Sequence, residues 1–156
     1  MRTLLLSVLV PVLAGCASKV FRPGDKPFAP AGESVGAISV ASSARVQSVR
    51  LETVAGTDSL SLEIARDGAQ AFLIHAAPAR YCLRSLESSS GGFSFPWPPD
   101  ANTQCVDLVV GDPQYLGRLS ITRAEDGTWA VTRENAYNAD KAELETRFGP
   151  MTLMKK

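Results

Sequence analysis

The chain has 156 residues, of which 45% are hydrophobic, and this length and composition suit one folded domain rather than a disordered chain. Its 16 basic and 16 acidic side chains give a formal net charge of zero, and no run of basic residues occurs. Electrostatic attraction therefore gives no reason to expect binding to nucleic acid or to another polyanion.

The chain opens with a short apolar run that ends in Leu13-Ala14-Gly15-Cys16. Arg2 precedes about 11 apolar-dominated residues, which fits the apolar region of a secretory signal and is too short for a transmembrane helix of roughly 20 residues. The small residues before Cys16 resemble the lipobox of bacterial lipoproteins. This resemblance implies a signal peptide over residues 1–15 and lipidation of Cys16 by diacylglycerol and a further acyl chain such as palmitate. The alternative is an ordinary secretory signal with an incidental cysteine.

The residue after the cysteine is Ala17 rather than the aspartate that resembles an inner-membrane retention signal. We therefore expect a lipid-anchored protein of the cell envelope, held at the outer membrane and facing the periplasm. Residues 16–34 contain Pro23, Pro27 and Pro30 without helical or strand periodicity, and this pattern predicts a flexible tether that spans up to roughly 60 Å when extended. Phe21 and Phe28 are its candidates for docking onto the domain.

Beyond the tether, short runs with a period of two are separated by turn residues, as in half-buried strands. In the second run, Val49 and Leu51 alternate with Arg50 and Glu52, and the turn after it predicts a hairpin with the third run. In the sixth run, the same alternation places Val106, Leu108 and Val110 inward. The eight runs cover residues 35–40, 46–54, 59–65, 71–75, 80–87, 105–110, 114–122 and 127–133.

The C-terminal segment has helical features instead. Asp140 followed by Glu143 predicts a capping box that starts a helix. Opposite charges at i and i+4 support it, and Gly149-Pro150 ends it after about three turns. We expect an all-β fold over residues 35–156, an antiparallel β-sandwich of about eight short strands with this one α-helix packed on it.

Two cysteines remain once Cys16 is assigned to the lipid. Cys82 and Cys105 form an even pair in a chain expected to reach an oxidising compartment, which predicts a disulfide. Its closed loop of about 24 residues would contribute on the order of 3 kcal/mol. Two free thiols in a redox or metal site are the alternative, but the spacing is not that of a CxxC motif. Because both cysteines lie opposite the apolar face of their strands, the disulfide is expected outside the central core.

Three short motifs carry a family resemblance. They are Phe72 followed by Pro78-Ala79-Arg80-Tyr81, the segment Gln114-Tyr115-Leu116-Gly117-Arg118-Leu119, and the helix end Arg147-Phe148-Gly149-Pro150. Together they resemble small bacterial lipoproteins of unknown function that carry transthyretin-like or carboxypeptidase-regulatory-like β-sandwich domains. The resemblance spans roughly Gly36 to Met151 and implies a transthyretin-like sandwich in the cell envelope. It implies no catalytic residues.

Candidate chemistry is sparse. His75, the only histidine, ends an apolar run, where it is either a base of a Ser-His-acid hydrolase or a strand-end histidine bonded to backbone or water. No Gly-x-Ser-x-Gly elbow accompanies it. The acidic side chains form no paired-carboxylate site and no oxygen-rich cation loop, so we expect no catalytic residue, metal or cofactor.

The most unusual stretch lies inside the expected disulfide loop, where a Ser-Gly run over residues 88–92 precedes aromatic and proline residues up to Asp100. Phe93, Phe95 and Trp97 either fold back to plug the open end of the sandwich or form a binding loop held at both ends. We expect a non-enzymatic interaction or accessory protein, attached to the membrane by its lipid, with an envelope protein or peptidoglycan as partner. The alternative is an envelope hydrolase or inhibitor that acts on cell-wall glycan or peptide. The sequence does not indicate the oligomeric state.

Overall fold

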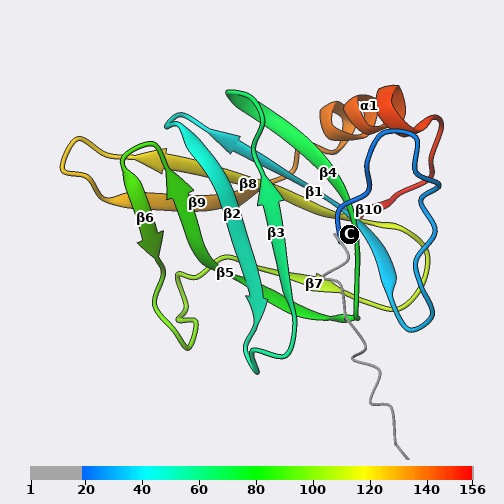
Figure 1. The fold of residues 1–156 in the computed structure, drawn as a ribbon, viewed down its shortest axis with the longest axis horizontal. Coiled ribbons are helices and arrows are strands. Elements are labelled where there is room, and N and C mark those ends of the chain that lie inside the picture. The colour runs from blue at the N-terminus through cyan, green and yellow to red at the C-terminus, as the bar shows by residue number, and fades with distance from the viewer. Residues whose placement is uncertain (1–18, 156) are drawn as a thin grey trace, which may run out of the picture.

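The computed structural model describes residues 19–155, which form two β-sheets packed face to face and one α-helix (Figure 1). The predicted signal peptide and the lipidation site Cys16 lie outside the described residues. Within the described part of the chain, no helix is both long and apolar enough to cross a membrane. The predicted all-β sandwich with one C-terminal helix is confirmed.

Ten strands occur in residues 19–155, five in each sheet. Sheet A consists of β1 (Ser34–Ser42), β4 (Gly68–Ala76), β8 (Gln114–Arg123), β9 (Trp129–Glu134) and β10 (Met154–Lys155). Sheet B consists of β2 (Val46–Thr53), β3 (Ser59–Glu63), β5 (Ala79–Ser88), β6 (Gly91–Ser94) and β7 (Cys105–Leu108). The two strands that were not predicted, β6 and β10, are among the shortest.

Each sheet is built around one ten-residue strand that pairs with two short strands along one side. In sheet B, β5 pairs with β2 on one side and with β7 and then β6 on the other, all antiparallel. In sheet A, β8 pairs with β1 on one side and with β10 and then β9 on the other. The β1–β8 and β10–β8 pairings are parallel, so sheet A is mixed.

This arrangement defines two ends of the sandwich. The anchor end is where β1, β5 and β8 begin and β4 finishes, and it includes the turns that connect β2 to β3 and β7 to β8. The cleft end is where β5 and β8 finish, next to β6 and the β8–β9 hairpin. Ten residues of β8 separate the two ends by about 30 Å, because a strand rises about 3.3 Å per residue.

A bulge in β8 sets which side chains reach the core. Tyr115 faces the outer side of sheet A, whereas both Leu116 and Leu119 belong to the cluster between the sheets. The pairing with β1 shifts at Gly117, whose φ of +103° is a conformation that other residues avoid. The extra residue shifts the alternation by one position, so that Leu119 rather than Arg118 faces the core, which explains the glycine in the Tyr-Leu-Gly-Arg-Leu motif.

Helix α1 (Tyr137–Phe148) covers the outer face of sheet A (Figure 1). Leu144 is fully buried in a second apolar cluster, together with Ala37 and Leu73 from the outer face of the sheet. The predicted end at Gly149 and the Lys141–Glu145 ion pair are both present. Most of β1, the middle of β4 and the first four residues of β8 are therefore buried on both faces, whereas β9 is largely exposed.

The predicted start of this helix at a capping box is wrong. The N-cap residue is Ala136, and Asp140 lies in the first turn with 1% of its surface exposed. Its carboxylate accepts hydrogen bonds from Ser39 Oγ at 2.5 Å and from Tyr115 Oη at 2.6 Å, and it forms an ion pair with Arg118. A buried carboxylate needs such partners, and here they fix the helix to the sheet.

The predicted inward position of Val110 is also wrong. Strand β7 ends at Leu108, and Val110 is 81% exposed in the connection to β8. The alternation holds for Val106 and Leu108, which are buried. After them the chain turns from sheet B to sheet A, and the side-chain alternation ends with the strand.

The segment before β1 contacts the domain at its start. Val20 forms a β-bridge with Ile74, and the backbone N–H of Phe21 donates to the carbonyl of Leu73 at 2.9 Å. The Phe21 ring is buried, whereas Phe28 is 81% exposed. Of the two phenylalanines considered for docking, Phe21 docks, and it does so near the beginning of the segment that was predicted to be a tether.

Candidate binding cleft

The loop that carries the predicted aromatic residues leaves and rejoins the same edge of β5. The N–H of Phe95 donates to the carbonyl of Arg84 at 3.0 Å, and the N–H of Leu83 donates to the carbonyl of Gln104 at 2.9 Å. Adjacent residues of β5 therefore hold both ends of residues 95–104. These two bonds lie between the pairings with β7 and with β6, so the loop is an excursion from an otherwise continuous ladder.

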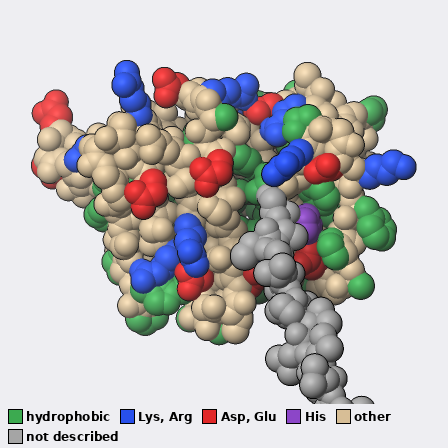
Figure 2. Space-filling view, viewed as in Figure 1, with side chains coloured by type: hydrophobic (Ala, Val, Ile, Leu, Met, Phe, Trp, Pro, Cys, Tyr) green, Lys and Arg blue, Asp and Glu red, His purple; other side chains and the backbone are tan. Residues whose placement is uncertain are grey.

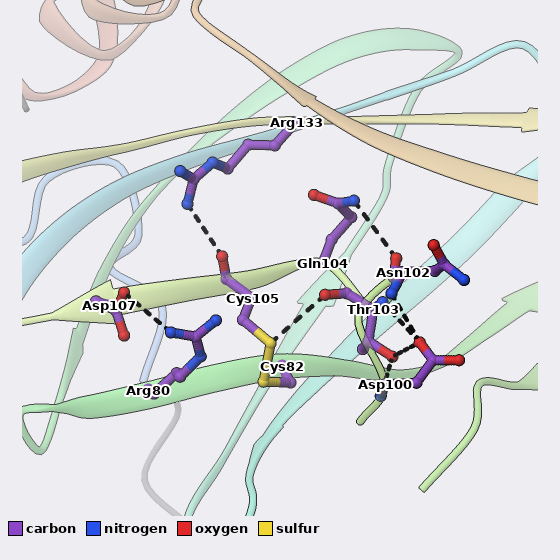
Figure 3. The surroundings of a disulfide bond; sticks show 9 residues. All are labelled: Arg80, Cys82, Asp100, Asn102, Thr103, Gln104, Cys105, Asp107 and Arg133. Carbon is purple, nitrogen blue, oxygen red and sulfur yellow. Dashed lines mark hydrogen bonds and ion pairs between the residues drawn. A yellow bond between two sulfur atoms is a disulfide. The ribbon is translucent and has the colours of Figure 1, made fainter. Parts of the chain in front are cut away.

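A disulfide closes the base of this loop, as predicted. Cys82 and Cys105 are directly opposite each other in the β5–β7 pairing, with their Cα atoms 4.0 Å apart (Figure 3). Cys82 is buried but does not belong to the central apolar cluster, in agreement with the expected position outside the core. Arg133 Nη1 donates to the carbonyl of Cys105 at 3.0 Å, which connects β9 of sheet A to the base of the loop.

Asp100 organises the return of the loop to β7 (Figure 3). Its Oδ1 accepts hydrogen bonds from the N–H of Asn102 at 2.9 Å and from both the N–H and the Oγ1 of Thr103 at 3.0 Å. The Thr103 hydroxyl and these backbone donors lower the pKa of the Asp100 carboxyl below its usual value. The carboxylate is thus occupied within the loop.

An open cleft of about 460 Å³ separates this loop from the β8–β9 hairpin at the cleft end. The ring of Phe93 lies edge-on to Phe95, with centroids 5.1 Å apart, and 6.5 Å from Trp129 of the opposite sheet. These rings form the apolar part of the lining. The cleft is lined by Leu83, Phe93, Phe95, Pro96, Asp100, Ala101, Asn102, Thr103, Gln104, Trp129, Ala130 and Val131.

The three predicted aromatic residues have different positions. Phe95 packs against the central core, Phe93 is 38% exposed in the cleft, and Trp97 lies outside the lining. The guanidinium of Arg84 lies over the Trp97 ring, 5.1 Å from its centroid. One phenylalanine therefore closes the core, as in the plug interpretation, while the other faces solvent in a cleft.

The second wall of the cleft was not identified from the sequence. Trp129 and Val131 belong to the last predicted strand, residues 127–133, and both are half-buried. The guanidinium of Arg123 covers one side of the Trp129 ring at 5.4 Å, and the same side chain donates to Ser90 Oγ at 2.8 Å. Trp129 lies opposite Phe93 because the two sheets pack face to face. No local sequence pattern indicates which residues this packing brings together.

The chemistry of the lining is apolar and neutral polar. Asp100 is the one ionisable residue among the residues that line the cleft, and its carboxylate already accepts three hydrogen bonds. Asn102 and Gln104 add side-chain amides, which both donate and accept. Acidic and basic side chains are mixed on the face of the molecule that Figure 2 shows, without a large patch of one sign.

His75 lies at the other end of the molecule from the cleft. Its Nδ1 contacts the Glu33 carboxylate, and its ring is 4.9 Å from that of Phe21. In residues 19–155, no serine hydroxyl hydrogen-bonds to this ring, and no group of three His, Cys, Asp or Glu side chains is placed to hold a metal ion. The ring of His75 thus contacts a carboxylate, a partner that the sequence did not suggest.

No protein-family model matches the chain, and no curated protein matches it. Among solved structures, the NMR structure of a protein from Eubacterium rectale is similar, with 13% sequence identity and a TM-score of 0.40. The match covers 69% of this chain and 93% of that chain. The function proposed below therefore depends on the residues of this chain.

Proposed function

We propose that this protein is a lipid-anchored, non-enzymatic accessory protein of the cell envelope that binds its partner in the cleft between Phe93 and Trp129. The observation that carries the proposal is the cleft itself, an aromatic site whose loop is held by a disulfide and by two bonds to β5. A loop that is fixed before binding loses less conformational entropy when a ligand orders it. The lipobox resemblance of Leu13 to Cys16 supports the envelope location.

The lining favours an uncharged ligand that has one apolar face and several hydroxyl or amide groups. Such a ligand can stack its apolar face on Phe93 and Trp129 while its polar edge bonds to the side chains of Asn102 and Gln104. A sugar ring has this two-sided chemistry. Among the partners expected from the sequence, the glycan strands of peptidoglycan therefore fit best, and the volume of about 460 Å³ lies in the range of small-ligand sites, about 300 to 1,000 Å³.

Sedimentation with purified peptidoglycan tests this proposal. The mature protein is expected to sediment with the insoluble sacculi, and Phe93→Ala and Trp129→Ala are each expected to raise the Kd, measured from the bound fraction at increasing amounts of sacculi, about tenfold, the equivalent of one lost aromatic contact of about 1.4 kcal/mol. Val110→Ala, an exposed change at the anchor end, is the matched control and is expected to bind like the wild type.

Two results would contradict the proposal. Equal binding of Phe93→Ala, Trp129→Ala and the wild type would exclude the cleft as the binding site. Absence of wild-type binding would exclude peptidoglycan glycan as the ligand. Release of soluble fragments from the sacculi by the wild-type protein would instead establish a hydrolase, the alternative that the sequence left open.

A further inference from the structure

The described part of the chain begins very close in sequence to the proposed lipid. Lys19 is only three residues after Cys16, and three residues span at most about 10 Å when fully extended. The carbonyl of Lys19 accepts a hydrogen bond from the N–H of His75 at 2.9 Å, and Val20 is bridged to Ile74. The chain is thus attached to β4 before the proline-containing residues 22–33, so these residues do not lengthen the connection between the lipid and the sandwich.

This attachment lies at the anchor end of the sandwich. The Lys19 ammonium forms an ion pair with Asp58 on the β2–β3 turn, and the Tyr81 hydroxyl contacts the other oxygen of that carboxylate at 2.7 Å. The side chains of Lys19 and Asp58 are 26% and 19% exposed, so the pair is largely protected from solvent. Lys19 is therefore held to sheet B as well as to sheet A.

Large apolar side chains are exposed at the same end. Val109 and Val110 are 43% and 81% exposed in the β7–β8 connection, and Met154 is 49% exposed. The N–H of Met154 donates to the carbonyl of Pro113 at 2.8 Å, so β10 lies directly beside that connection. Val54, on the β2–β3 turn, is 51% exposed.

The figures agree with this distribution. In Figure 1, residues 22–33 and the β7–β8 connection both lie at the right of the molecule, away from β6 and the β8–β9 hairpin. Figure 2 shows several hydrophobic side chains on that side of the same view, and others at the lower left. Of the six large hydrophobic residues that are exposed in residues 19–155, only Phe93 lies at the cleft end.

We propose that the anchor end rests directly on the lipid bilayer, with Val109, Val110 and Met154 in contact with the headgroup region and the cleft facing away from the membrane. This inference rests on the proposed lipidation of Cys16. The headgroup layer is about 5 to 7 Å thick on each side of the bilayer. The three residues from Cys16 to Lys19 span at most about 10 Å, so the start of the sandwich lies at the surface of the headgroup layer. Apolar side chains at such a surface enter the headgroup boundary, which accounts for their exposure.

Tryptophan quenching by brominated lipids tests this orientation, because both native tryptophans, Trp97 and Trp129, lie at the cleft end. The lipidated protein is reconstituted in phosphatidylcholine–phosphatidylglycerol vesicles with bromine on the upper part of the acyl chains. In a background with both native tryptophans changed to Phe, Val110→Trp and Met154→Trp each place one reporter at the anchor end. Each reporter is expected to lose a large part of its emission, whereas the wild-type protein keeps its emission in the same vesicles.

The controls separate the orientation from the anchor. Mass analysis of the N-terminal peptide reports acylation of Cys16, and its absence would refute the proposed lipid anchor without involving the quenching result. If Cys16 is acylated and either reporter is quenched no more than the wild-type tryptophans, the orientation is wrong. The same reporters in unlipidated protein with Cys16→Ser are expected to show little quenching. Strong quenching in this control would mean that the introduced tryptophans themselves bind the membrane, and would contradict an orientation set by the lipid anchor.

Discussion

The two ends of the sandwich are closed by different kinds of interaction. At the anchor end, polar side chains meet in pairs, Lys19 with Asp58 and Glu33 with His75, and the Tyr81 hydroxyl completes the first pair. At the cleft end, the sheets face each other across the rings of Phe93 and Trp129, 6.5 Å apart, and an open cleft remains. The paired polar groups already bond to each other within the protein, whereas the half-exposed aromatic rings remain accessible for stacking on a ligand. We therefore propose attachment at one end and recognition at the other.

The disulfide at the base of the cleft loop is expected to make the largest single contribution to the stability of the cleft end. Changing both Cys82 and Cys105 to Ala is expected to lower the free energy of unfolding by about 3 kcal/mol, because the unfolded chain regains the entropy of a closed loop whose ends are 23 residues apart. Urea unfolding of the mature protein measures this change. In native-state hydrogen exchange, residues 95–104 are expected to lose most of their protection, whereas the protection of β4 is expected to fall only by as much as the global free energy of unfolding. Residues 95–104 that lose no more protection than β4 would contradict a local role for the disulfide.

The anchor end is expected to respond to acid through Asp58. Burial alone would raise the pKa of its carboxyl, but the hydrogen bonds from Lys19 and Tyr81 outweigh burial and lower the pKa. A carboxyl whose pKa is lower in the folded state stabilises the fold above its unfolded pKa of 3.8, and this stabilisation is lost as the pH falls through the folded value. Asp58→Asn is therefore expected to cost about 1 to 2 kcal/mol near pH 6.

The difference between Asp58→Asn and the wild type is expected to shrink as the pH falls below about 4, where the wild-type carboxyl also becomes neutral. Urea unfolding of both proteins between pH 6 and pH 3 measures it. A difference that stays constant over this range would show that the charge of Asp58 does not stabilise the anchor end. The neighbouring Tyr81 hydroxyl has a raised pKa because of burial and of Asp58, so it stays protonated throughout.

The cleft aromatics are expected to matter more for binding than for stability. Phe93→Ala removes a 38% exposed ring whose contacts with Phe95 and Trp129 are edge-on or tilted, so we expect a loss of about 1 kcal/mol of unfolding free energy. Thermal unfolding measures this. A loss of 3 kcal/mol or more, the range for a buried Phe→Ala change, would make Phe93 a core residue instead.

The smallest effect is expected at the exposed valines of the anchor end. Val110→Ser changes a side chain that is 81% exposed, and such surface changes usually alter stability by about 0.5 kcal/mol or less. Thermal unfolding of the unlipidated protein in solution measures this. A clear destabilisation would mean that Val110 packs within the domain, so that membrane contact would no longer be needed to explain this apolar side chain.

The sequence predicted the parts of this fold that local patterns control. Alternation located eight strands, and the cysteine count predicted the disulfide. Strand β6 begins with Gly91 and Gly92, and β10 has only two residues, so neither shows an alternating pattern. The parallel contact of β1 with β8 joins segments about 80 residues apart, and nothing local encodes it.

The same distinction holds for the candidate site. Phe93, Phe95 and Trp97 stood out because aromatic residues follow a Ser-Gly run, yet only the first two line the cleft. Nothing in the sequence singled out Trp129 for the site, because its position opposite Phe93 depends on how the two sheets pack. Asp140 has the spacing of a capping residue, but its carboxylate binds Ser39 and Tyr115 across the sheet.

The emission of the two native tryptophans tests most directly that the cleft end is the recognition end. Trp97 and Trp129 flank or line the cleft, so soluble glycan fragments of peptidoglycan are expected to change their emission in a saturable way. The change is expected to disappear in Phe93→Ala and to persist in Val110→Ala. Unchanged emission at glycan concentrations where the protein is bound would place recognition elsewhere on the molecule and contradict the account.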